Sequence, residues 1–413
     1  MQLLIPRKLF YAAMVVALAP VSAVADGLPP LFGDGVHDDT AAIQARLDSG
    51  ISCVYLPPPQ KCYLVSKALE VNSEQELRLD RYSVVRLAPK SDCHMLVNKN
   101  WQTGDRRVAV TGGIWDFNNL EQSPNPHMTM HCDPPYEAKI PDHFERDFFH
   151  GEIFTFDKVE GLELRGITLR NPTTYGIQMT RTSYFHVDDI SLDYTTWNPS
   201  PLNLDGIHLD GGCHHGRITN VRGTALDDMV ALNSADWVCS AYEGPIHDVD
   251  IDGIYADYSH SAVRLLAAGT SVSRVTIRNV HGNFYVYAIG LTQHFKDKPR
   301  GRFEDIVIEN VFAAKARTPD GISSRKDYPL IWVQEGSDVG NLSIRNYRRY
   351  EKEYGVPSVK VDKNATVRRL SVRDCRMEGS LAAPIKFLDV EGDVGETVVD
   401  GNEVFAPFVQ FSK

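Results

Sequence analysis

Three aspartates in two short segments of the chain have the residue type and spacing that acid–base chemistry needs. Asp205 in segment 203–210 precedes alternating apolar residues, and segment 225–233 repeats this design with Asp227 and Asp228. If both segments are strands on successive coils of a solenoid, they stack at about 4.8 Å and crowd the three carboxylates together. Because like charges that close cannot all ionise freely, at least one pKa should rise. A carboxylic acid with a raised pKa beside an ionised carboxylate is suited to hydrolysis of a glycosidic bond.

A repeated β unit is the element that must position these carboxylates. From residue 70 onward, an apolar alternation, a turn with Asn, Asp or Gly and a second alternation recur. The matching positions are Ile251, Ile277, Ile308, Ile344 and Val372. A β unit of this size with loops of varying length indicates a β-solenoid, an all-β fold. In its Ile-Arg-Asn-Val form, Asn occupies the bend, where it tolerates left-handed geometry and can hydrogen-bond to neighbouring coils. A β-sandwich is the alternative, but its strands need tighter and more even turns.

The N-terminus predicts a secretory signal peptide. Arg7 and Lys8 precede the apolar run 9–19, and the small residues 23–25 offer a cleavage site. The apolar run is too short for a membrane span, and no later run is long enough to cross a bilayer. We therefore expect residues 1–25 to be removed and the mature protein to be secreted or periplasmic. A membrane-anchoring helix is the alternative.

The mature chain, residues 26–413, is expected to form one solenoid domain. A cap at about residues 30–60 should contain a short helix over 41–48, because the end coil of a solenoid otherwise exposes core and backbone. The residues that can begin this helix are Asp38, Asp39 and Thr40. A loop insertion at about 119–150, rich in Pro and His, interrupts the repeats and is interpreted as a solvated lid.

The net charge and the cysteines indicate which partners, disulfides and metal sites to expect. The net charge is −11, and the signal peptide contains bases but no acids, so we expect no nucleic-acid partner. An exported protein can oxidise its cysteines, and Cys53 and Cys62 could be bridged across a turn. There is no CxxC pair and no Cys/His cluster at zinc spacing, so we predict no metal and no cofactor. The pair His214-His215 has no third ligand in sight. The sequence does not indicate an oligomeric state.

Several of these motifs resemble those of the polygalacturonase-like glycoside hydrolases. The stretches 110–118 and 156–172 are similar to early turns of that family. Asn203-Leu-Asp-Gly206 stands where the family has Asn-Thr-Asp-Gly, and Leu226-Asp-Asp228 stands where it has Gly-Asp-Asp. The resemblance covers about residues 100–295. It implies a single right-handed parallel β-helix and hydrolysis of a polysaccharide or oligosaccharide with inversion.

The resemblance also implies a role for each aspartate. The residue matching Asp227 is the general acid of the family, and those matching Asp205 and Asp228 position and activate the water. Inversion needs a water between acid and base and therefore carboxyl groups about 6.5–9.5 Å apart. Side chains on neighbouring coils can supply that separation, whereas the adjacent pair alone cannot.

The chain departs from the family on the next two coils. Ser259-His-Ser261 stands where the family has Gly-His-Gly, so His260 matches and can hydrogen-bond an acid or a sugar hydroxyl. Gly290-Leu-Thr292 replaces the Arg-Ile-Lys that binds the substrate carboxylate, so both bases are absent. Arg264 is the nearest replacement, and its bidentate partner is either Asp228 or the substrate. A neutral or differently charged glycan therefore fits better than galacturonan.

Other residues are candidates for the same groove. The substrate-binding candidates besides Arg264 are Asn203, His208, Thr292 and His294. His208 and Asp210 alternate outward from the apolar residues, which makes Asp210 a rival acid. Asp188-Asp189 resembles the second aspartate pair, but we interpret it as a solvated bend. The alternative functions are a polysaccharide lyase or epimerase, which would need calcium or a Lys, Arg or Tyr base near a uronate, and a non-catalytic, tailspike-like glycan-binding solenoid.

Overall fold

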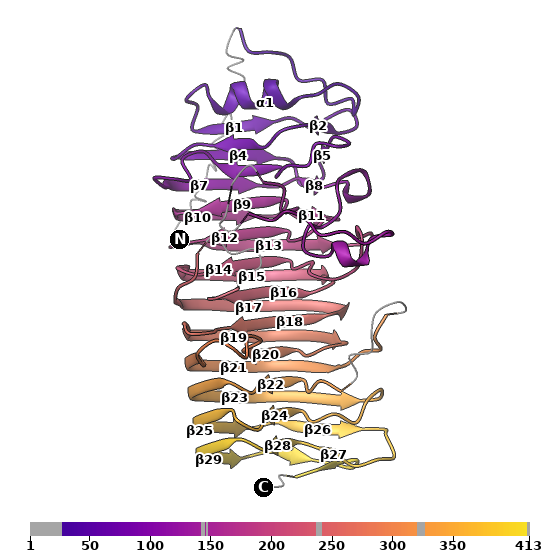
Figure 1. Ribbon diagram of the computed structural model, residues 1–413, viewed down its shortest axis with the longest axis vertical. Coiled ribbons are helices and arrows are strands. Elements are labelled where there is room, and N and C mark those ends of the chain that lie inside the picture. The colour runs from indigo at the N-terminus through magenta and orange to yellow at the C-terminus, as the bar shows by residue number, and fades with distance from the viewer. Residues whose placement is uncertain (1–26, 142–144, 146–147, 237–241, 320–326, 411–413) are drawn as a thin grey trace, which may run out of the picture.

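The strands of the protein stack in parallel along one long axis (Figure 1). The computed structural model describes residues 27–141, 145, 148–236, 242–319 and 327–410. The expected signal peptide, residues 1–25, lies outside these described residues. The pairing of strands is parallel throughout the sheets, and the predicted all-β solenoid is confirmed.

Sheet B, an eleven-stranded sheet with short strands, forms one side of the solenoid. Its strands follow one another in chain order, so each coil adds one strand. They are β3 (Leu69–Val71), β6 (Leu96–Asn98), β9 (Phe154–Asp157), β12 (Ile177–Thr180), β14 (Ile207–Asp210), β16 (Asp228–Asn233), β18 (Ser261–Leu266), β20 (Ile289–Thr292), β22 (Ile331–Val333), β24 (Val359–Val361) and β28 (Leu388–Val390).

Sheet A, an eighteen-stranded sheet, covers the remaining sides. Its strands are β1 (Cys53–Leu56), β2 (Tyr63–Val65), β4 (Gln75–Leu79), β5 (Val84–Leu87), β7 (Asp105–Thr111), β8 (Ile114–Asp116), β10 (Val159–Arg165), β11 (Thr168–Arg170), β13 (His186–Asp193), β15 (His214–Thr224), β17 (Ile246–Ser259), β19 (Ser271–Phe284), β21 (Gly301–Lys315), β23 (Ser337–Glu351), β25 (Thr366–Arg373), β26 (Arg376–Gly379), β29 (Asp393–Asp400) and β30 (Glu403–Val404). A small third sheet pairs β27 (Ile385–Lys386) with β31 (Phe408–Val409).

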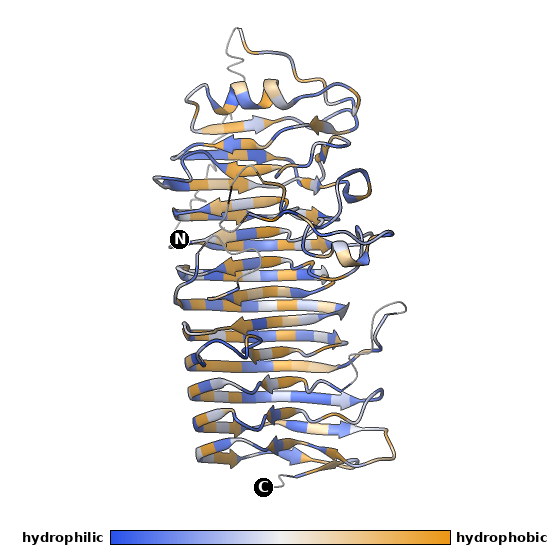
Figure 2. Ribbon diagram, in the orientation of Figure 1, coloured by the Kyte–Doolittle hydropathy of each residue, from blue (hydrophilic) through white to orange (hydrophobic). Residues whose placement is uncertain are grey.

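The predicted register of the repeats is confirmed in sheet A. Ile251 pairs with Ile277, Ile277 with Ile308, Ile308 with Ile344, and Ile344 with Val372. These side chains are fully buried, and each one stacks on its equivalent in the coil below. Figure 2 shows the alternation of hydrophobic and hydrophilic residues along these strands, which directs one set of side chains into the core and the other outward.

Asparagines mark the bends of the long strands, as the repeat predicts. Asn279, Asn310 and Asn346 have positive φ angles of 58°, 54° and 52°. The side chain of Asn310 donates to that of Asn279 at 3.2 Å, and Asn346 donates to Asn310 at 2.8 Å. Each bend is therefore fixed by the coil above and the coil below it.

The helix α1 (Thr40–Leu47) packs on the first coil of the solenoid (Figure 1). Ile43 and Leu47 lie on its inner face and are fully buried. The expected cap differs in one respect, because the side chain of Asp39 makes no capping hydrogen bond and instead accepts from the backbone N–H groups of Phe32 and Gly33. Asp38 accepts from the backbone N–H of Thr40 at 2.8 Å.

The insertion 119–150 contains two short 3₁₀ turns, η1 (Asn119–Glu121) and η2 (Thr129–His131). The proposed bridge between Cys53 and Cys62 is not formed, because both cysteines are free. The sulfur of Cys53 lies 3.6 Å from a carboxylate oxygen of Glu76, whereas Cys62 is buried. Within the described residues, no helix has the length and apolar character needed to cross a membrane.

Candidate active site

The aspartates lie at or just before the start of two neighbouring strands of sheet B, β14 and β16. β14 pairs with β16 so that Ile207 lies beside Val230 and Leu209 beside Leu232. The N–H of Gly206 donates to the carbonyl oxygen of Asp228 at 2.9 Å, so the backbone of Asp205 is level with that of Asp228. The expected meeting of the two segments on successive coils is therefore observed.

Glycine at position 206 is required by this close approach. A Cβ atom there would lie 2.6 Å from a methyl carbon of Leu192 and 2.6 Å from the carbonyl oxygen of Met229. The chain turns at this glycine, because Leu204 and Ile207 both enter the core while Asp205 lies between them on the outer side. The glycine thus allows a carboxylate to leave an otherwise apolar segment.

Asp205 is buried among polar groups. Its Oδ1 accepts the N–H of Asp228 at 3.0 Å, and its Oδ2 lies 2.6 Å from Nδ1 of His208. Burial raises the pKa of Asp205, the hydrogen bond from His208 opposes that rise, and the charge of Asp228 adds to it. One pKa is therefore raised as expected, but burial is the main cause and the crowding of like charges adds to it.

Asp228 is also fully buried and receives several donors. Its Oδ1 accepts the hydroxyl of Ser261 and that of Tyr287, the latter at 3.2 Å. Its Oδ2 lies 2.9 Å from Nε of Arg264. Burial raises the pKa of Asp228, Arg264 opposes that rise and Asp227 adds to it.

Asp227 is the one member of the trio that reaches the surface. Its side chain is 18% exposed, whereas those of Asp205 and Asp228 are 1% and 0% exposed. Its Oδ2 accepts the backbone N–H of Asn203 at 3.2 Å, and its Oδ1 lies 3.5 Å from Nδ1 of His260. Asn203 therefore holds Asp227 through its backbone.

Arg264 forms an ion pair with the aspartates. Besides Asp228, its Nη2 lies 3.9 Å from Asp205 and 3.8 Å from Asp236. Its side chain is only 13% exposed. Of the two partners considered from the sequence, the structure supplies Asp228, and the guanidinium balances the negative charge of the buried carboxylates.

His208 bridges two aspartates. Its Nε2 lies 3.2 Å from Oδ1 of Asp210, and its ring stacks on Tyr175 at 4.0 Å. Burial lowers the pKa of His208, but the hydrogen bonds to Asp205 and Asp210 outweigh burial and raise it to about 10. The imidazole is therefore a buried cation at neutral pH.

Asp210 does not reach the surface as a rival acid. It is fully buried, and its Oδ2 accepts from the side chains of Gln178 and Thr180, each at 2.9 Å. With His208 on its other oxygen, this carboxylate is surrounded by donors.

Of the three positions considered on the coil of β20, Gly290 and Thr292 offer no free polar side chain to a ligand. Thr292 is fully buried and its hydroxyl donates to the carbonyl oxygen of Leu265 at 3.2 Å. Gly290 lies beneath Tyr287, so that a Cβ there would be 3.0 Å from the ring. His294 follows β20 and is exposed. The structure thus leaves His294 as the accessible candidate of this coil.

The hydroxyls on Asp228 are the part of the site that sequence reasoning missed. Ser261 pairs with Asp228 in the register of β16 and β18. Tyr287 follows β19 and precedes β20, and its hydroxyl reaches the same carboxylate from the coil beyond Ser261. The signal for both was their position on the coils after Asp228, but the position of a loop residue is known only once the coil lengths are fixed.

Two histidines of the insertion, His127 and His150, are buried, whereas His131 is exposed, so the interpretation of a solvated lid is corrected for part of this segment. His127 and His150 are 8% and 3% exposed and their rings stack at 6.2 Å. They lie near the buried Glu152, which approaches Nδ1 of His94 at 3.3 Å. Burial lowers the pKa of His127 to about 4. The parts of the insertion around His127 and His150 therefore pack against His94 and Glu152, whereas most of the described residues 130–141 are exposed or half-buried.

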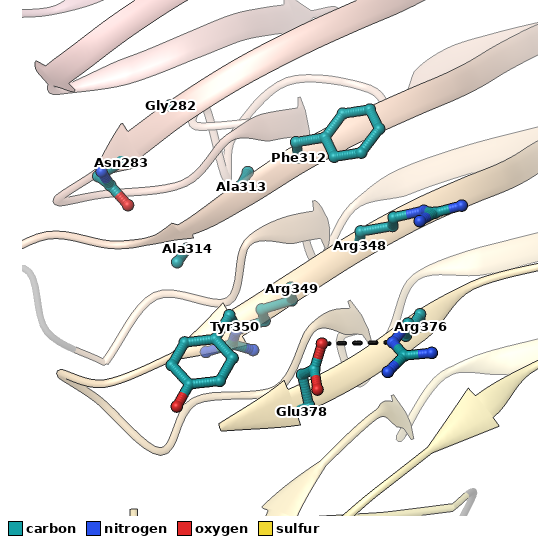
Figure 3. Close-up of a pocket in the computed structure, with 10 residues that line it drawn as sticks. All are labelled: Gly282, Asn283, Phe312, Ala313, Ala314, Arg348, Arg349, Tyr350, Arg376 and Glu378. Carbon is teal, nitrogen blue, oxygen red and sulfur yellow. Dashed lines mark hydrogen bonds and ion pairs between the residues drawn. The ribbon is translucent and has the colours of Figure 1, made fainter. Parts of the chain in front are cut away.

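A surface pocket elsewhere does not have the chemistry of the aspartate cluster. It lies on sheet A between β19, β21, β23 and β26, as Figure 3 shows. Phe312, Arg348 and Tyr350 contribute to its wall, and its one carboxylate, Glu378, pairs with Arg376 at 3.3 Å. A single paired carboxylate cannot provide both an acid and a base.

Comparison with known proteins identifies similar structures. No family model matches the chain, and no curated protein sequence matches it. The Family 28 exopolygalacturonase of Yersinia enterocolitica has a TM-score of 0.53 at 14% identity, covering 92% of this chain and 75% of that one. The endo-xylogalacturonan hydrolase of Aspergillus tubingensis has a TM-score of 0.53 at 14% identity, covering 93% and 95%.

A phage protein is equally similar. Gene product 12 of bacteriophage phi29, in its pre-mature form, has a TM-score of 0.54 at 14% identity, covering 92% of this chain and 56% of that one. Hydrolases and a phage protein thus share this architecture, and likeness at this level of identity concerns the fold alone. The chain therefore has the right-handed parallel β-helix fold of these solved structures.

Proposed function

We propose that the protein is a secreted or periplasmic glycoside hydrolase that cleaves a polysaccharide or oligosaccharide with inversion. The observation that supports this most strongly is the meeting of Asp205, Asp227 and Asp228 on two neighbouring coils of sheet B. An inverting hydrolase needs one carboxyl as acid and another as base on opposite sides of the scissile bond.

Asp227 is the proposed general acid. It is the carboxyl at the surface, and two groups fix its orientation, the N–H of Asn203 and the ring of His260. A substrate that lies along sheet B would meet this oxygen first. The acid would donate its proton to the glycosidic oxygen as the bond to the anomeric carbon breaks.

Asp205 and Asp228 are the proposed partners of the water. Each carboxylate lies beside a group that favours the ionised form: Asp205 has a hydrogen bond to His208, and Asp228 has the charge of Arg264. Burial works in the opposite direction on both pKa values, which makes these carboxylates stronger bases than a solvated aspartate. One of them would take a proton from the water as it attacks the anomeric carbon.

The proposed substrate is a glycan without a carboxylate at the cleaved unit. Arg264 is the cation of this cluster, and it already lies beside Asp228, Asp205 and Asp236. Gly290 and Thr292 bring no charge. An added uronate would face several carboxylates, and Arg264 is already paired with them, so a neutral sugar is favoured.

The test is a reducing-end assay on the purified protein with a panel of plant, algal and microbial polysaccharides. We expect new reducing ends from at least one neutral glycan, and no absorbance from an unsaturated product. Binding of a glycan with no new reducing ends would instead favour a non-catalytic β-helix.

A lyase or epimerase is the second candidate, because of one observation. Asp227, Asp228 and His260 each offer a ligand atom, and these atoms lie within 4.8 Å of one another. A divalent cation held there could neutralise a uronate, as such reactions require. Loss of activity with a chelator, together with an unsaturated product, would favour this candidate over hydrolysis.

A further inference from the structure

Three histidines and an aspartate gather at one corner of the solenoid, where the chain enters sheet A. His214 and His215 begin β15, and His247 and Asp248 lie at the start of β17 on the next coil. His214 is the register partner of His247. The pair that lacked a third ligand in the sequence therefore has further candidate ligands on the coil beside it.

Three of these residues offer ligand atoms at suitable separations. Nδ1 of His247 lies 2.7 Å from Oδ2 of Asp248, and Nε2 of His215 lies 3.9 Å from the same oxygen. All three ligand atoms lie within 4.8 Å of one another. Zinc bonds of about 2.0–2.2 Å in tetrahedral geometry place neighbouring ligand atoms roughly 3.3–3.5 Å apart. The observed separations lie on either side of that value, so small side-chain rotations are sufficient.

The fourth residue orients the ligands. Nδ1 of His214 lies 2.8 Å from Nδ1 of His215, and that hydrogen bond leaves Nε2 of His215 to face Asp248. The ring of His214 also stacks on that of His247 at 5.0 Å and an interplanar angle of 6°. Hydrogen bonding at one ring nitrogen determines which nitrogen binds a metal, so His214 orients His215, and its stacking fixes the ring plane of His247.

Arg274 is the residue that competes for the carboxylate. Its Nε lies 2.6 Å from Oδ1 of Asp248 and its Nη2 lies 2.8 Å from Oδ2. An ionised carboxylate has about four acceptor positions, so Oδ2 can bind a metal while Oδ1 keeps its bond to Nε of Arg274. Metal-bound carboxylates are commonly hydrogen-bonded in this way.

We propose that His215, His247 and Asp248 form a binding site for Zn²⁺ or a similar divalent transition metal. Two imidazoles and one carboxylate suit these ions, whereas calcium and magnesium prefer oxygen ligands. The side chains of His215, His247 and Asp248 are 47%, 28% and 30% exposed, so the ion can enter from solvent and water can complete its coordination. The bound ion would connect the coil of β15 to that of β17.

The experiment is a calorimetric titration of the untagged protein with zinc chloride. We expect one site per chain, a higher melting temperature with zinc, and visible absorption bands when Co²⁺ replaces Zn²⁺. H215A and H247A should each lower the affinity at least 100-fold. H214F, which keeps the stacking but removes the hydrogen bond, should lower it about 10–100-fold.

Two control variants make the result decisive. H281A removes a histidine of β19 that stacks on Tyr255 and Phe312 on the same sheet, and should bind zinc as the parent does. D227N removes a carboxylate of the trio on sheet B and should also leave zinc binding unchanged, so this proposal fails or holds independently of the hydrolase proposal. Equal zinc affinity in the parent, H215A and H247A, or zinc binding lost in D227N, would overturn the site.

Discussion

Two pairs of adjacent aspartates lie on different sheets of the same solenoid and differ in how far their carboxylates are exposed to solvent. Asp188 and Asp189 lie on β13 in sheet A, while Asp228 begins β16 in sheet B and Asp227 directly precedes it. The side chain of Asp189 is 25% exposed and pairs with Arg81 at 2.5 Å. The side chain of Asp228 has no exposed area and pairs with Arg264 at 2.9 Å.

The pKa values of Asp189 and Asp228 move in opposite directions. The hydrogen bond from Arg81 lowers the pKa of Asp189, and burial opposes that effect only in part. Burial raises the pKa of Asp228 in spite of Arg264. An Asp-Asp dipeptide therefore does not by itself indicate an acid–base site. An arginine at the surface keeps the aspartate ionised, whereas burial raises the pKa of the carboxyl. The backbone of Asp189 has a positive φ of 57°, as the interpretation of Asp188-Asp189 as a bend predicts.

The largest expected effect is on catalysis. D227N should lower kcat/KM by about 10²–10⁴-fold on the best substrate, because it removes the proposed proton donor. D189N, the matched change on sheet A, should leave kcat/KM within about twofold. Initial rates of reducing-end formation measure both. A similar loss in the two variants would mean that the two pairs do not differ in function.

Removing an arginine partner from each aspartate pair should lower the free energy of unfolding by different amounts on the two sheets. R264M leaves buried carboxylates without their cation and should cost about 3–5 kcal/mol of unfolding free energy. Arg222, the second partner of Asp189, has a side chain that is 46% exposed. R222M should therefore cost less than about 1 kcal/mol of unfolding free energy. Denaturant unfolding of both variants gives the comparison. Adding D228N to R264M should restore part of the loss, because the unpaired charge is removed.

The pH dependence of stability should also differ between the sheets. The folded-state pKa of His208 is about 10, above the ordinary value of about 6.5. Its charged form therefore contributes stability that is complete below about pH 6.5 and is lost as the pH rises through about 10. The difference in melting temperature between the parent and H208Q should shrink across this range. For D189N it should stay constant, since the carboxyl of Asp189 is ionised throughout. A constant difference for H208Q would contradict the assignment.

The smallest expected effect concerns the backbone beneath Asp205. G206A should cost about 1–3 kcal/mol, because the new Cβ would lie 2.6 Å from the backbone oxygen of Met229. G355A is the control, since the nearest atom to a Cβ there is 3.9 Å away on Ile385. Melting temperatures of the two variants test this. Equal stability would show that the coil relaxes easily at the turn before β14.

Much of the fold could be predicted because the solenoid repeats one physical requirement on every coil. Apolar residues must face inward at matching positions, so Ile277 and Ile308 could be aligned from the sequence, and the structure pairs them. The bend at Asn279 could also be predicted, because few other residues tolerate a φ of 58°.

The polar partners of the site could not be predicted in the same way. The apolar pattern predicts that Asp205 lies beside the segment 225–233, but only the structure shows that its backbone is level with that of Asp228. The hydroxyl of Tyr287 and the ligands His247 and Asp248 follow loops of unequal length, so their positions depend on where each coil ends. A predicted binding residue such as Thr292 can also donate its hydroxyl to the backbone, and no sequence pattern reveals that.

The measurement that tests the central proposal most directly is the anomeric configuration of the first product. Proton NMR spectra recorded during the first minutes of hydrolysis, on the substrate that the polysaccharide panel identifies, give this configuration before mutarotation. If Asp227 acts as acid and Asp205 and Asp228 activate the water, the first product has the anomeric configuration opposite to that of the substrate. A product of retained configuration, or an unsaturated sugar, would contradict the account.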